Sequence, residues 1–224
     1  MENGAGMHAV ADWRRGSLRV RGMMLLTVAM ALGTGGCALL YFAGGKGEQK
    51  ALYELPKKQR VLVLVDTRAS AEPPPGFSAR LGAAISTHLY RFKAADNLVS
   101  QDRLSSLRQD VNAFAKLGVA DIARACDADC VVVVDVWEFS ITTSSDKAII
   151  QGSTQAFVKV VAKDGSRLWP VGIQAGTPIE AHVDPVLVSE KDRDAIAHEM
   201  MDLLTVRAAR MFHAYDMEDK QMTL

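Results

Sequence analysis

Two cysteines that lie four positions apart, Cys126 and Cys130, have the most versatile chemistry in this sequence of 224 residues. Two thiols at this spacing can contribute to a metal site, form a disulfide, or pack as small apolar groups. A structural zinc site needs four ligands, and with 3 cysteines in total the sequence offers no second pair. Cys126 is expected at the end of a helix and Cys130 at the start of a strand, so their side chains should diverge. We therefore favour two packed thiols, and a disulfide between them is the alternative.

Carboxylates and histidines offer little further chemistry. Asp66 follows a predicted strand, and Asp135 lies inside another, where a buried carboxylate needs a polar partner. We expect Asp135 to bind backbone groups or an arginine, and a proton-transfer pair of Asp66 and Asp135 is the alternative. His182 has Glu180 and Asp184 nearby, but three ligands from one loop rarely hold a metal ion. The sequence therefore predicts no catalytic residue, no metal or other cofactor, and no enzymatic activity.

The first 36 residues have the pattern of an export signal. Their arginines at positions 14, 15, 19 and 21 precede the uncharged run MMLLTVAMAL over residues 23–32, which is followed by the small residues GTGG. A basic region, a short apolar run and a site of small residues are typical of a secretory signal peptide. The apolar run alone is too short to cross a bilayer. We therefore predict that residues 1–36 direct export and are then removed.

The segment Thr34-Gly35-Gly36-Cys37 resembles the lipobox of bacterial lipoproteins. The resemblance implies that the Cys37 thiol receives fatty acyl chains, such as palmitate, and that Cys37 becomes the new amino terminus. Thr34 departs from the pattern, since a typical lipobox has Leu at this position. The alternative is an uncleaved transmembrane anchor over residues 23–43, with three glycines near its centre. Both interpretations place the remaining chain in the cell envelope, facing the periplasm, and leave open whether the inner or the outer membrane holds it.

The overall composition excludes other broad classes of protein. Lys and Arg number 26, as do Asp and Glu, and 49% of the residues are hydrophobic. This is ordinary globular usage, which excludes wholesale disorder. A nucleic-acid partner is not expected, because binding to phosphates needs a basic surface and the net charge is zero. Residues 37–58, which include the Gly-rich stretch GGKGEQKAL, are predicted to be the lipidated cysteine and a tether.

An α/β domain is predicted over residues 59–172. The apolar runs RVLVLV at residues 60–65 and CVVVVDV at residues 130–136 predict buried strands. Between them, apolar residues recur at helical spacing over residues 77–92, and Ser100 can begin a further helix. A brief strand at residues 97–99 and a short helix near residues 120–126 complete this part.

The remaining chain is predicted to add antiparallel strands and one long helix. Residues 154–160 alternate in polarity, and Asp164-Gly165 is typical of a hairpin turn that leads into a strand from residue 167. Residues 173–224 are predicted to form an irregular connection and a C-terminal helix that packs on the domain. The irregular stretch covers residues 172–188, and the helix runs from Ser189 to about Tyr215. The predicted fold class is α/β (α+β), with a mixed sheet of about four to five strands flanked by helices and a long C-terminal amphipathic helix.

Five segments over roughly residues 59–170 share their pattern with a known group of domains: RVLVLVD, FSARLGAAISTHLYRF, LVSQDRL, VADIARACDADCVVVVDV and VKVVAKDGSRLW. They resemble the envelope lipoprotein domains typified by the activators of penicillin-binding proteins, the curli secretion lipoprotein and the amino-terminal domain of TolB. Asp127 departs from the pattern, which usually has Gly at this position. The resemblance implies a non-enzymatic role, either docking to a partner protein or assembling in the envelope.

Three aromatic residues on predicted strands, Trp137, Phe139 and Trp169, are expected in the core or, if exposed, on a partner surface. The sequence thus predicts a membrane-anchored lipoprotein that binds another envelope protein. The alternative is a homo-oligomeric subunit of an envelope assembly or secretion complex, in which the loop over residues 140–148 extends for strand pairing between subunits.

Overall fold

A mixed six-stranded sheet organises the part of the chain that the computed structural model describes, residues 48–68 and 72–216. Its strands are β2 (Arg60–Thr67), β3 (Asn97–Leu98), β4 (Cys130–Thr143), β5 (Ile149–Ala162), β6 (Arg167–Trp169) and β7 (Thr177–Leu187). The pairing order is β3, β2, β4, β5, and the far edge of β5 then pairs with both β6 and β7. β2 is parallel to β3 and β4, and the other pairs are antiparallel. The predicted signal peptide and Cys37 lie outside the described residues.

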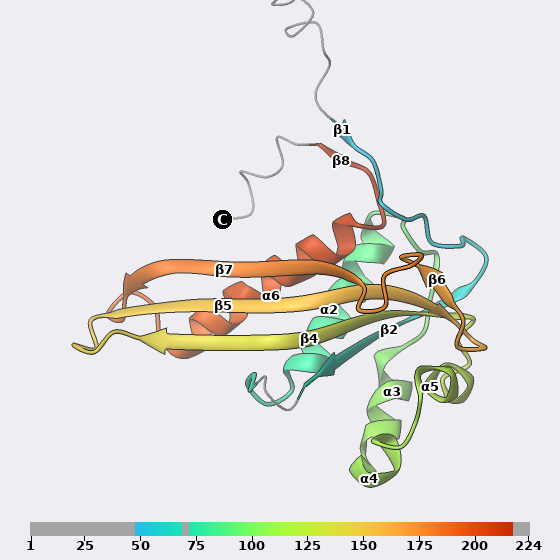
Figure 1. The fold of residues 1–224 in the computed structure, drawn as a ribbon, viewed down its shortest axis with the longest axis horizontal. Coiled ribbons are helices and arrows are strands. Elements are labelled where there is room, and N and C mark those ends of the chain that lie inside the picture. Colours follow the sequence, from blue (N-terminus) through green and yellow to red (C-terminus); the bar gives the residue numbers. More distant parts are fainter. Residues whose placement is uncertain (1–47, 69–71, 217–224) are drawn as a thin grey trace, which may run out of the picture. The chain divides into compact units, whose positions relative to one another are not determined.

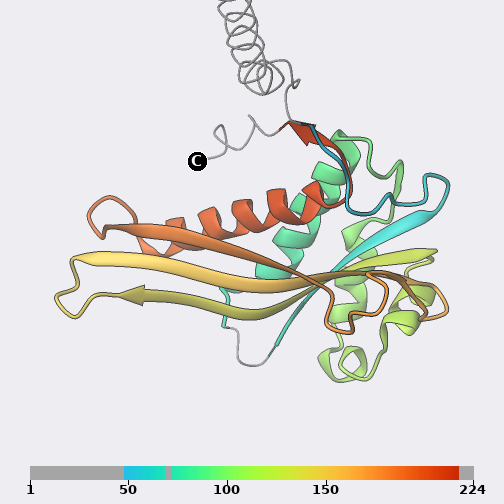
Figure 2. The same ribbon diagram turned by 45° about the horizontal axis from the view of Figure 1, so that its top comes forward.

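Helices lie on both sides of this sheet. They are α2 (Phe77–Arg91), α3 (Gln101–Arg108), α4 (Val111–Phe114), α5 (Val119–Ala125) and α6 (Arg193–Arg210). Figures 1 and 2 show α2 and α6 on one side of the sheet and α3 to α5 on the other side, near β2. A separate antiparallel ribbon pairs β1 (Glu48–Gln49) with β8 (Tyr215–Asp216), so the two ends of the described domain lie side by side.

The inner face of the sheet is the side that α2 and α6 cover. Most of the predicted apolar stripe of α2 is buried there, with Leu81, Ile85 and Leu89 at 0% exposure, whereas Phe92 after the end of the helix is exposed. α6 rests directly on β5, because a Cβ atom at Gly152 would lie 2.6 Å from Cγ2 of Ile196. The same atom would lie 2.8 Å from the sulfur of Met200 in α6. Glycine therefore sets the distance between this helix and the sheet.

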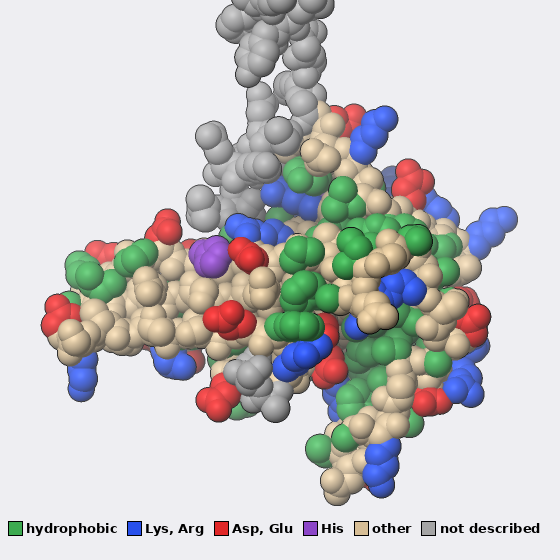
Figure 3. Space-filling model, viewed as in Figure 1, with side chains coloured by type: hydrophobic (Ala, Val, Ile, Leu, Met, Phe, Trp, Pro, Cys, Tyr) green, Lys and Arg blue, Asp and Glu red, His purple; other side chains and the backbone are tan. Residues whose placement is uncertain are grey.

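The outer face, on the opposite side of the sheet, is covered by helices only at its β2 end. There Leu62 and Val131 pack against Leu104 of α3 and Ile122 of α5. Farther along β4, β5 and β7, no helix of the described chain lies over this face (Figures 1 and 2). Polar side chains and backbone cover most of it in Figure 3. Helices therefore cover both faces of the sheet at its β2 end, and only the inner face farther along β4, β5 and β7.

Side chains of α3 complete the edge of β2 that faces away from β4. The amide of Gln101 donates to the carbonyl oxygen of Val63 at 2.9 Å, and the guanidinium of Arg108 donates to that of Val65 at 2.5 Å. A row of unpaired backbone groups at a sheet edge is a site for unwanted strand pairing. These two side chains satisfy carbonyl oxygens of β2 beyond the point where the short strand β3 ends, so the edge does not present them for strand pairing.

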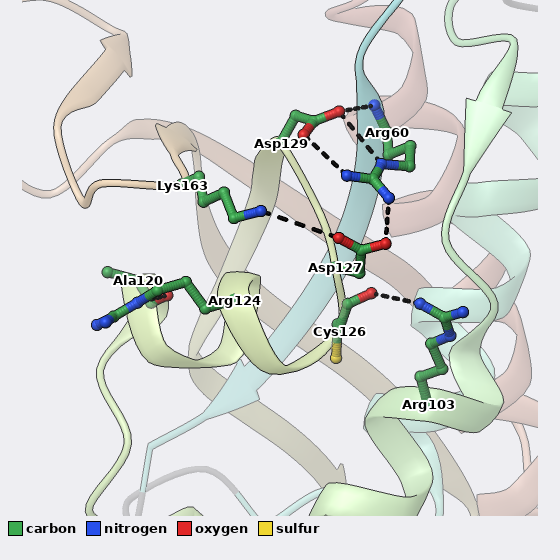
Figure 4. Close-up of polar contacts among 8 residues, drawn as sticks. All are labelled: Arg60, Arg103, Ala120, Arg124, Cys126, Asp127, Asp129 and Lys163. Atoms are coloured by element: carbon green, nitrogen blue, oxygen red, sulfur yellow. Dashed lines mark hydrogen bonds and ion pairs between the residues drawn. The ribbon is translucent and has the colours of Figure 1, made fainter.

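A group of charged side chains fixes the turn between α5 and β4 (Figure 4). Asp129 accepts the backbone N–H of Arg60 at 2.8 Å, and the Arg60 guanidinium binds both Asp129 and Asp127. Lys163 lies 3.9 Å from the other oxygen of Asp127. Asp127 has a φ of 57°, a left-handed conformation that favours glycine, which is the residue implied at this position by the resemblance described above. In this chain Asp127 adopts this conformation, and its carboxylate forms ion pairs with Arg60 and Lys163.

The predicted fold class is confirmed. The sheet is mixed, helices flank it, and α6 is the long helix near the C-terminus. The sheet has six strands, which exceeds the predicted four to five. α6 ends at Arg210, earlier than the expected Tyr215, which instead belongs to β8.

The prediction that residues 172–188 are irregular is wrong, because residues 177–187 form β7 along the edge of β5. β7 contains Pro178 and Pro185, although proline cannot donate to a sheet ladder. An edge strand tolerates proline, because one row of its backbone groups needs no partner strand. Its inward side chains, Ile179, Ala181 and Val183, are buried and alternate with exposed ones.

The structure also differs from the prediction of a tether over residues 37–58 in the second half of that range. Leu55 is 2% exposed, and the backbone N–H groups of Leu52 and Tyr53 both donate to the carbonyl oxygen of Met211. The Tyr53 ring stacks on Trp169 with centroids 6.0 Å apart. Residues 52–55 therefore belong to the folded domain, because their backbone is hydrogen-bonded to it and the side chain of Leu55 is buried in it, although Leu52 itself is exposed.

Replacing Gly152 with alanine tests the contact between α6 and β5. We expect Gly152→Ala to lower the free energy of unfolding by about 1–3 kcal/mol, since the added methyl overpacks a full core. Gly118→Ala is the matched control, because its Cβ would meet no atom closer than 3.5 Å. Denaturant unfolding of both variants measures the difference. Equal stability of Gly152→Ala and the wild type would contradict the close packing of α6 on β5.

Replacing Asp129 with asparagine tests the charged turn through its pH dependence. Hydrogen bonds from Arg60 hold the pKa of Asp129 below its ordinary value of 3.8. A carboxyl group with a lowered folded-state pKa stabilises the fold above its unfolded pKa and loses this effect as the pH falls through the folded-state pKa. We therefore expect Asp129→Asn to have a lower melting temperature than the wild type at neutral pH. Below about pH 3 the two melting temperatures should converge. Thermal melts followed by circular dichroism measure this, with the exposed Asp96→Asn as control. A difference from the wild type that is the same at every pH would rule out the ionic contribution.

Candidate functional site

An arginine, a carboxylate and two aromatic rings meet on the outer face. The guanidinium of Arg68 lies 3.6 Å from the centre of the Trp137 ring and donates to Asp135 at 3.4 Å. Trp137 in turn contacts Phe157, with ring centroids 4.7 Å apart. We call Arg68, Asp135, Trp137 and Phe157 the Arg68–Trp137 cluster. A guanidinium over an indole ring is a favourable cation–π arrangement, strongest where water is partly excluded.

Three neighbouring strands position this cluster. β2 and β4 pair in register, so Asp66 lies opposite Asp135, and the backbone N–H of Arg68 donates to the carbonyl oxygen of Val136 at 3.0 Å. β5 places Phe157 directly opposite Asp135 on the other side. A bulge in β4 leaves Trp137 without a register partner. Bulges commonly re-aim a side chain at a functional position.

The cluster is neither core nor fully solvated surface. The side chain of Asp135 is 14% exposed, whereas that of Arg68 is 50% exposed. Both Trp137 and Phe157 are half-buried. Next to them, Gln155 donates to Glu180 at 3.1 Å, and His182 lies 3.5 Å from the same carboxylate. An aromatic patch bordered by polar groups is therefore open on the outer face.

The two predicted acidic residues are each engaged separately. Although Asp66 and Asp135 are register neighbours, the Asp66 carboxylate accepts the backbone N–H of Thr67 at 3.0 Å. Asp135 binds Arg68, as the favoured interpretation of the sequence expected. The arrangement of these side chains favours an ion pair at Asp135 over the alternative of a proton-transfer pair.

The three aromatic residues named from the sequence do not share a surface. Phe139 is 7% exposed and packs edge-on against Phe77 in the inner core, so it cannot contribute to a partner surface. Trp169 packs between Tyr53 and Phe212 at the end of the sheet. The bulge in β4 explains the separation. Without it, Trp137 and Phe139 would lie on the same face of the strand, and with it Phe139 turns inward.

The two cysteines are buried as free thiols in different cores. Cys126 belongs to the outer core beneath α3 and α5, and Cys130 belongs to the inner core beneath α2 and α6. Burial raises the pKa of both thiols, to about 11 for Cys130. This arrangement corresponds to two packed thiols rather than to a disulfide.

His182, Glu180 and Asp184 lie at alternate positions of β7 and are exposed on the outer face. Within residues 48–68 and 72–216, no three His, Cys, Asp or Glu side chains are placed to hold a metal ion together. In the same ranges, no helix combines the length and the apolar character that a membrane crossing needs.

Sequence reasoning missed two members of the cluster, Arg68 and Phe157. The alternation of residues 154–160 did separate Phe157 from the face of Ala156 and Val158, which was a usable signal. Arg68 gave no such signal. Its position over Trp137 depends on the parallel register of β2 and β4, which brings together residues far apart in the sequence.

Comparisons with known proteins find likeness only at the level of structure. No protein-family model and no curated protein sequence matches the chain. Similar solved structures include lipoprotein GNA1162 from Neisseria meningitidis, with a TM-score of 0.42 and 11% identity over 68% of this chain and 99% of that one. A PelC dodecamer from Paraburkholderia phytofirmans has a TM-score of 0.36 and 11% identity over 74% of this chain and 97% of that one.

The C-terminal domain of LpoB from Escherichia coli is also similar, with a TM-score of 0.32 and 16% identity over 59% of this chain and 87% of that one. These structures include a bacterial lipoprotein, the class of protein that the sequence resembles.

Thiol titration tests the placement of the two cysteines. In the full chain carrying Cys37→Ser, only Cys126 and Cys130 remain, and both are 0% exposed. We expect neither to react with an aromatic disulfide reagent under native conditions at about pH 8, because burial disfavours the reactive thiolate. Both should react after denaturation without a reductant. Failure of either thiol to react in denaturant would show that they are oxidised and contradict the free thiols.

Proposed function

We propose that this protein is a non-enzymatic envelope lipoprotein, held on the periplasmic side of a membrane by acyl chains on Cys37. Its domain would bind another envelope protein through the outer face of β4, β5 and β7. The pattern Thr34-Gly35-Gly36-Cys37 supports the anchor, and residues 1–36 support export. Tethering raises the effective concentration of the domain at the membrane, so an interface of modest size suffices.

The Arg68–Trp137 cluster is the observation that carries the binding surface. Trp and Arg are enriched among the residues that dominate the energy of protein interfaces. Here Trp137 is half-buried beside Phe157, and Asp135 and Arg68 hold it in place by contacts that exist before any partner binds. A side chain that is ordered in advance loses less conformational entropy on binding. The cluster is therefore suited to be the centre of a docking surface.

The second candidate function is a homo-oligomeric subunit of an envelope assembly. It is favoured by the far end of β5 and β7, where Ile149 and Leu187 are register partners and are 40% and 49% exposed. Val188 beside them is 40% exposed. This apolar end adjoins the turn between β4 and β5, within the loop expected to extend between subunits.

Site-specific photo-crosslinking in native membranes tests the binding surface. A crosslinking amino acid at Gln155, next to the cluster, should give a product with one discrete envelope protein, whereas one at Lys116 after α4 should not. Combining the probe at Gln155 with Trp137→Ala should lower the yield about tenfold, because a central interface residue is lost. A product of twice the chain mass would identify the homo-oligomer instead. Equal products from Gln155 and Lys116 would contradict a surface on the outer face.

Two controls separate binding from folding and from anchoring. Phe139→Leu alters the buried inner core without touching the cluster, so it should leave the crosslink unchanged. Cys37→Ser should remove the acyl mass, which mass spectrometry of the membrane form detects, and should lower the crosslink yield by releasing the domain. Retention of an unacylated leader on the wild-type protein would contradict the anchor.

A further inference from the structure

The place where the chain enters the domain limits how far the domain can stand from the bilayer. The ribbon of β1 and β8 is the entry point, and its first residue, Glu48, is eleven positions after Cys37. At roughly 3.3–3.6 Å per residue, a fully extended chain of this length reaches about 40 Å at most. If Cys37 carries the acyl chains, as the proposed function holds, the ribbon end of the domain must stay near the membrane surface.

Two grooves flank this ribbon, and basic side chains line both. A groove of about 780 Å³ beside β7 and α6 is lined by Lys50, Arg207 and Arg210 among others. A groove of about 680 Å³ between α2 and α6 is lined by Arg91, Arg210 and two histidines, His88 and His213. The acidic residues in these linings are Glu180 in the first groove and Asp202 in the second. Basic side chains therefore outnumber acidic ones in the linings of the two grooves, whereas the ribbon itself carries the exposed acidic pair Glu48 and Asp216.

Exposed apolar and aromatic side chains lie at the same end. Leu52 follows β1 and is 56% exposed, and Phe92 at the end of α2 is 48% exposed. Tyr90 beside it is 66% exposed. Basic side chains in the last turns of α2 and α6 can be explained by favourable contact with helix C-termini. That explanation does not account for the apolar residues, whereas a surface that combines both kinds is typical of proteins lying at a lipid interface.

The ribbon end and the proposed partner surface face opposite sides of the sheet and adjoin at Glu180, which lines the first groove and accepts from Gln155. α2, α6 and the ribbon lie on the inner side of the sheet, and the Arg68–Trp137 cluster lies on the outer side (Figures 1 and 2). In Figure 3 basic, apolar and acidic side chains are visible around the ribbon. A domain that contacts the membrane through its ribbon end would keep the outer face of β4, β5 and β7 open toward the periplasm.

We propose that the ribbon face, defined as Lys50, Leu52, Tyr90, Arg91, Phe92 and Arg207, docks on the headgroups of anionic phospholipids. The basic side chains would be attracted to the lipid phosphates, and the apolar ones would enter the boundary with the acyl chains. The anchor on Cys37 then sets the distance of the domain from the membrane, and the ribbon face sets its orientation. This inference rests on the proposed anchor and adds a second contact with the membrane.

Lysine footprinting on reconstituted protein tests the inference. The protein purified from membranes is inserted into preformed vesicles of phosphatidylcholine alone or with about one-third phosphatidylglycerol, and acetylation by a water-soluble reagent is followed by mass spectrometry. We expect the acetylation rate of Lys50 to fall at least about fivefold with the anionic lipid and to recover at about 0.5 M salt. Lys116 and Lys147, which lie away from the ribbon, should react equally in both vesicles. Equal rates for Lys50 in the two vesicles would overturn the inference.

A matched pair of variants ties the protection to the ribbon face. Arg91→Glu should abolish the protection of Lys50, because it places a negative charge beside the lipid phosphates. Lys147→Glu makes the same change in charge at the turn between β4 and β5 and should leave the protection intact. Equal effects of both variants would contradict a local surface. A wild-type protein that fails to float with either vesicle would instead refute the anchor on Cys37, so the two failures are distinguishable.

Discussion

The parallel pairing of β2 with β4 is the constraint on which the rest of the domain depends. Where they pair, over Val61–Thr67 and Cys130–Val136, both strands are mostly apolar and lie between helices on both faces, as is usual for parallel strands. Polar contacts fix the pairing at its two ends. Asp129 binds the backbone N–H of Arg60 where the pair begins, and the N–H of Arg68 binds Val136 where it ends. A slip of one residue would turn every side chain of one strand to the other face.

This register carries through to the candidate site. It places the Arg68 guanidinium over Trp137 and next to Asp135, two residues that are about seventy positions later in the sequence. The bulge in β4 then divides the strand into two parts. In the part of β4 before the bulge, the valines point alternately into the inner and the outer core. After it, Phe139 faces inward, and the outer face is left without a covering helix in the described residues. The outer face of the sheet is uncovered here because the helices α3 to α5 lie only at its β2 end.

The elements that depend on local pattern could be predicted from the sequence, and those that depend on register could not. RVLVLV, CVVVVDV, the stripe of α2 and the turn at Gly165 each specify their own structure. β7 was missed because Pro178 and Pro185 argue against a strand, and only its place at an edge makes them acceptable. Phe139 lies in the core, as expected, but the sequence did not show that Trp137 faces the other way, because a single bulge reverses the alternation between them. Arg68 could be assigned only once two strands distant in the sequence were paired.

The central claim is that a protein partner covers the outer face around Trp137 and Phe157 in the envelope. Hydroxyl-radical footprinting compares the side-chain oxidation of these two residues in native membranes with that in the purified protein. The account predicts that both are oxidised in the purified protein and strongly protected in native membranes, while exposed Val111 on α4 is oxidised equally in both. Equal oxidation of Trp137 and Phe157 in the two samples would contradict it.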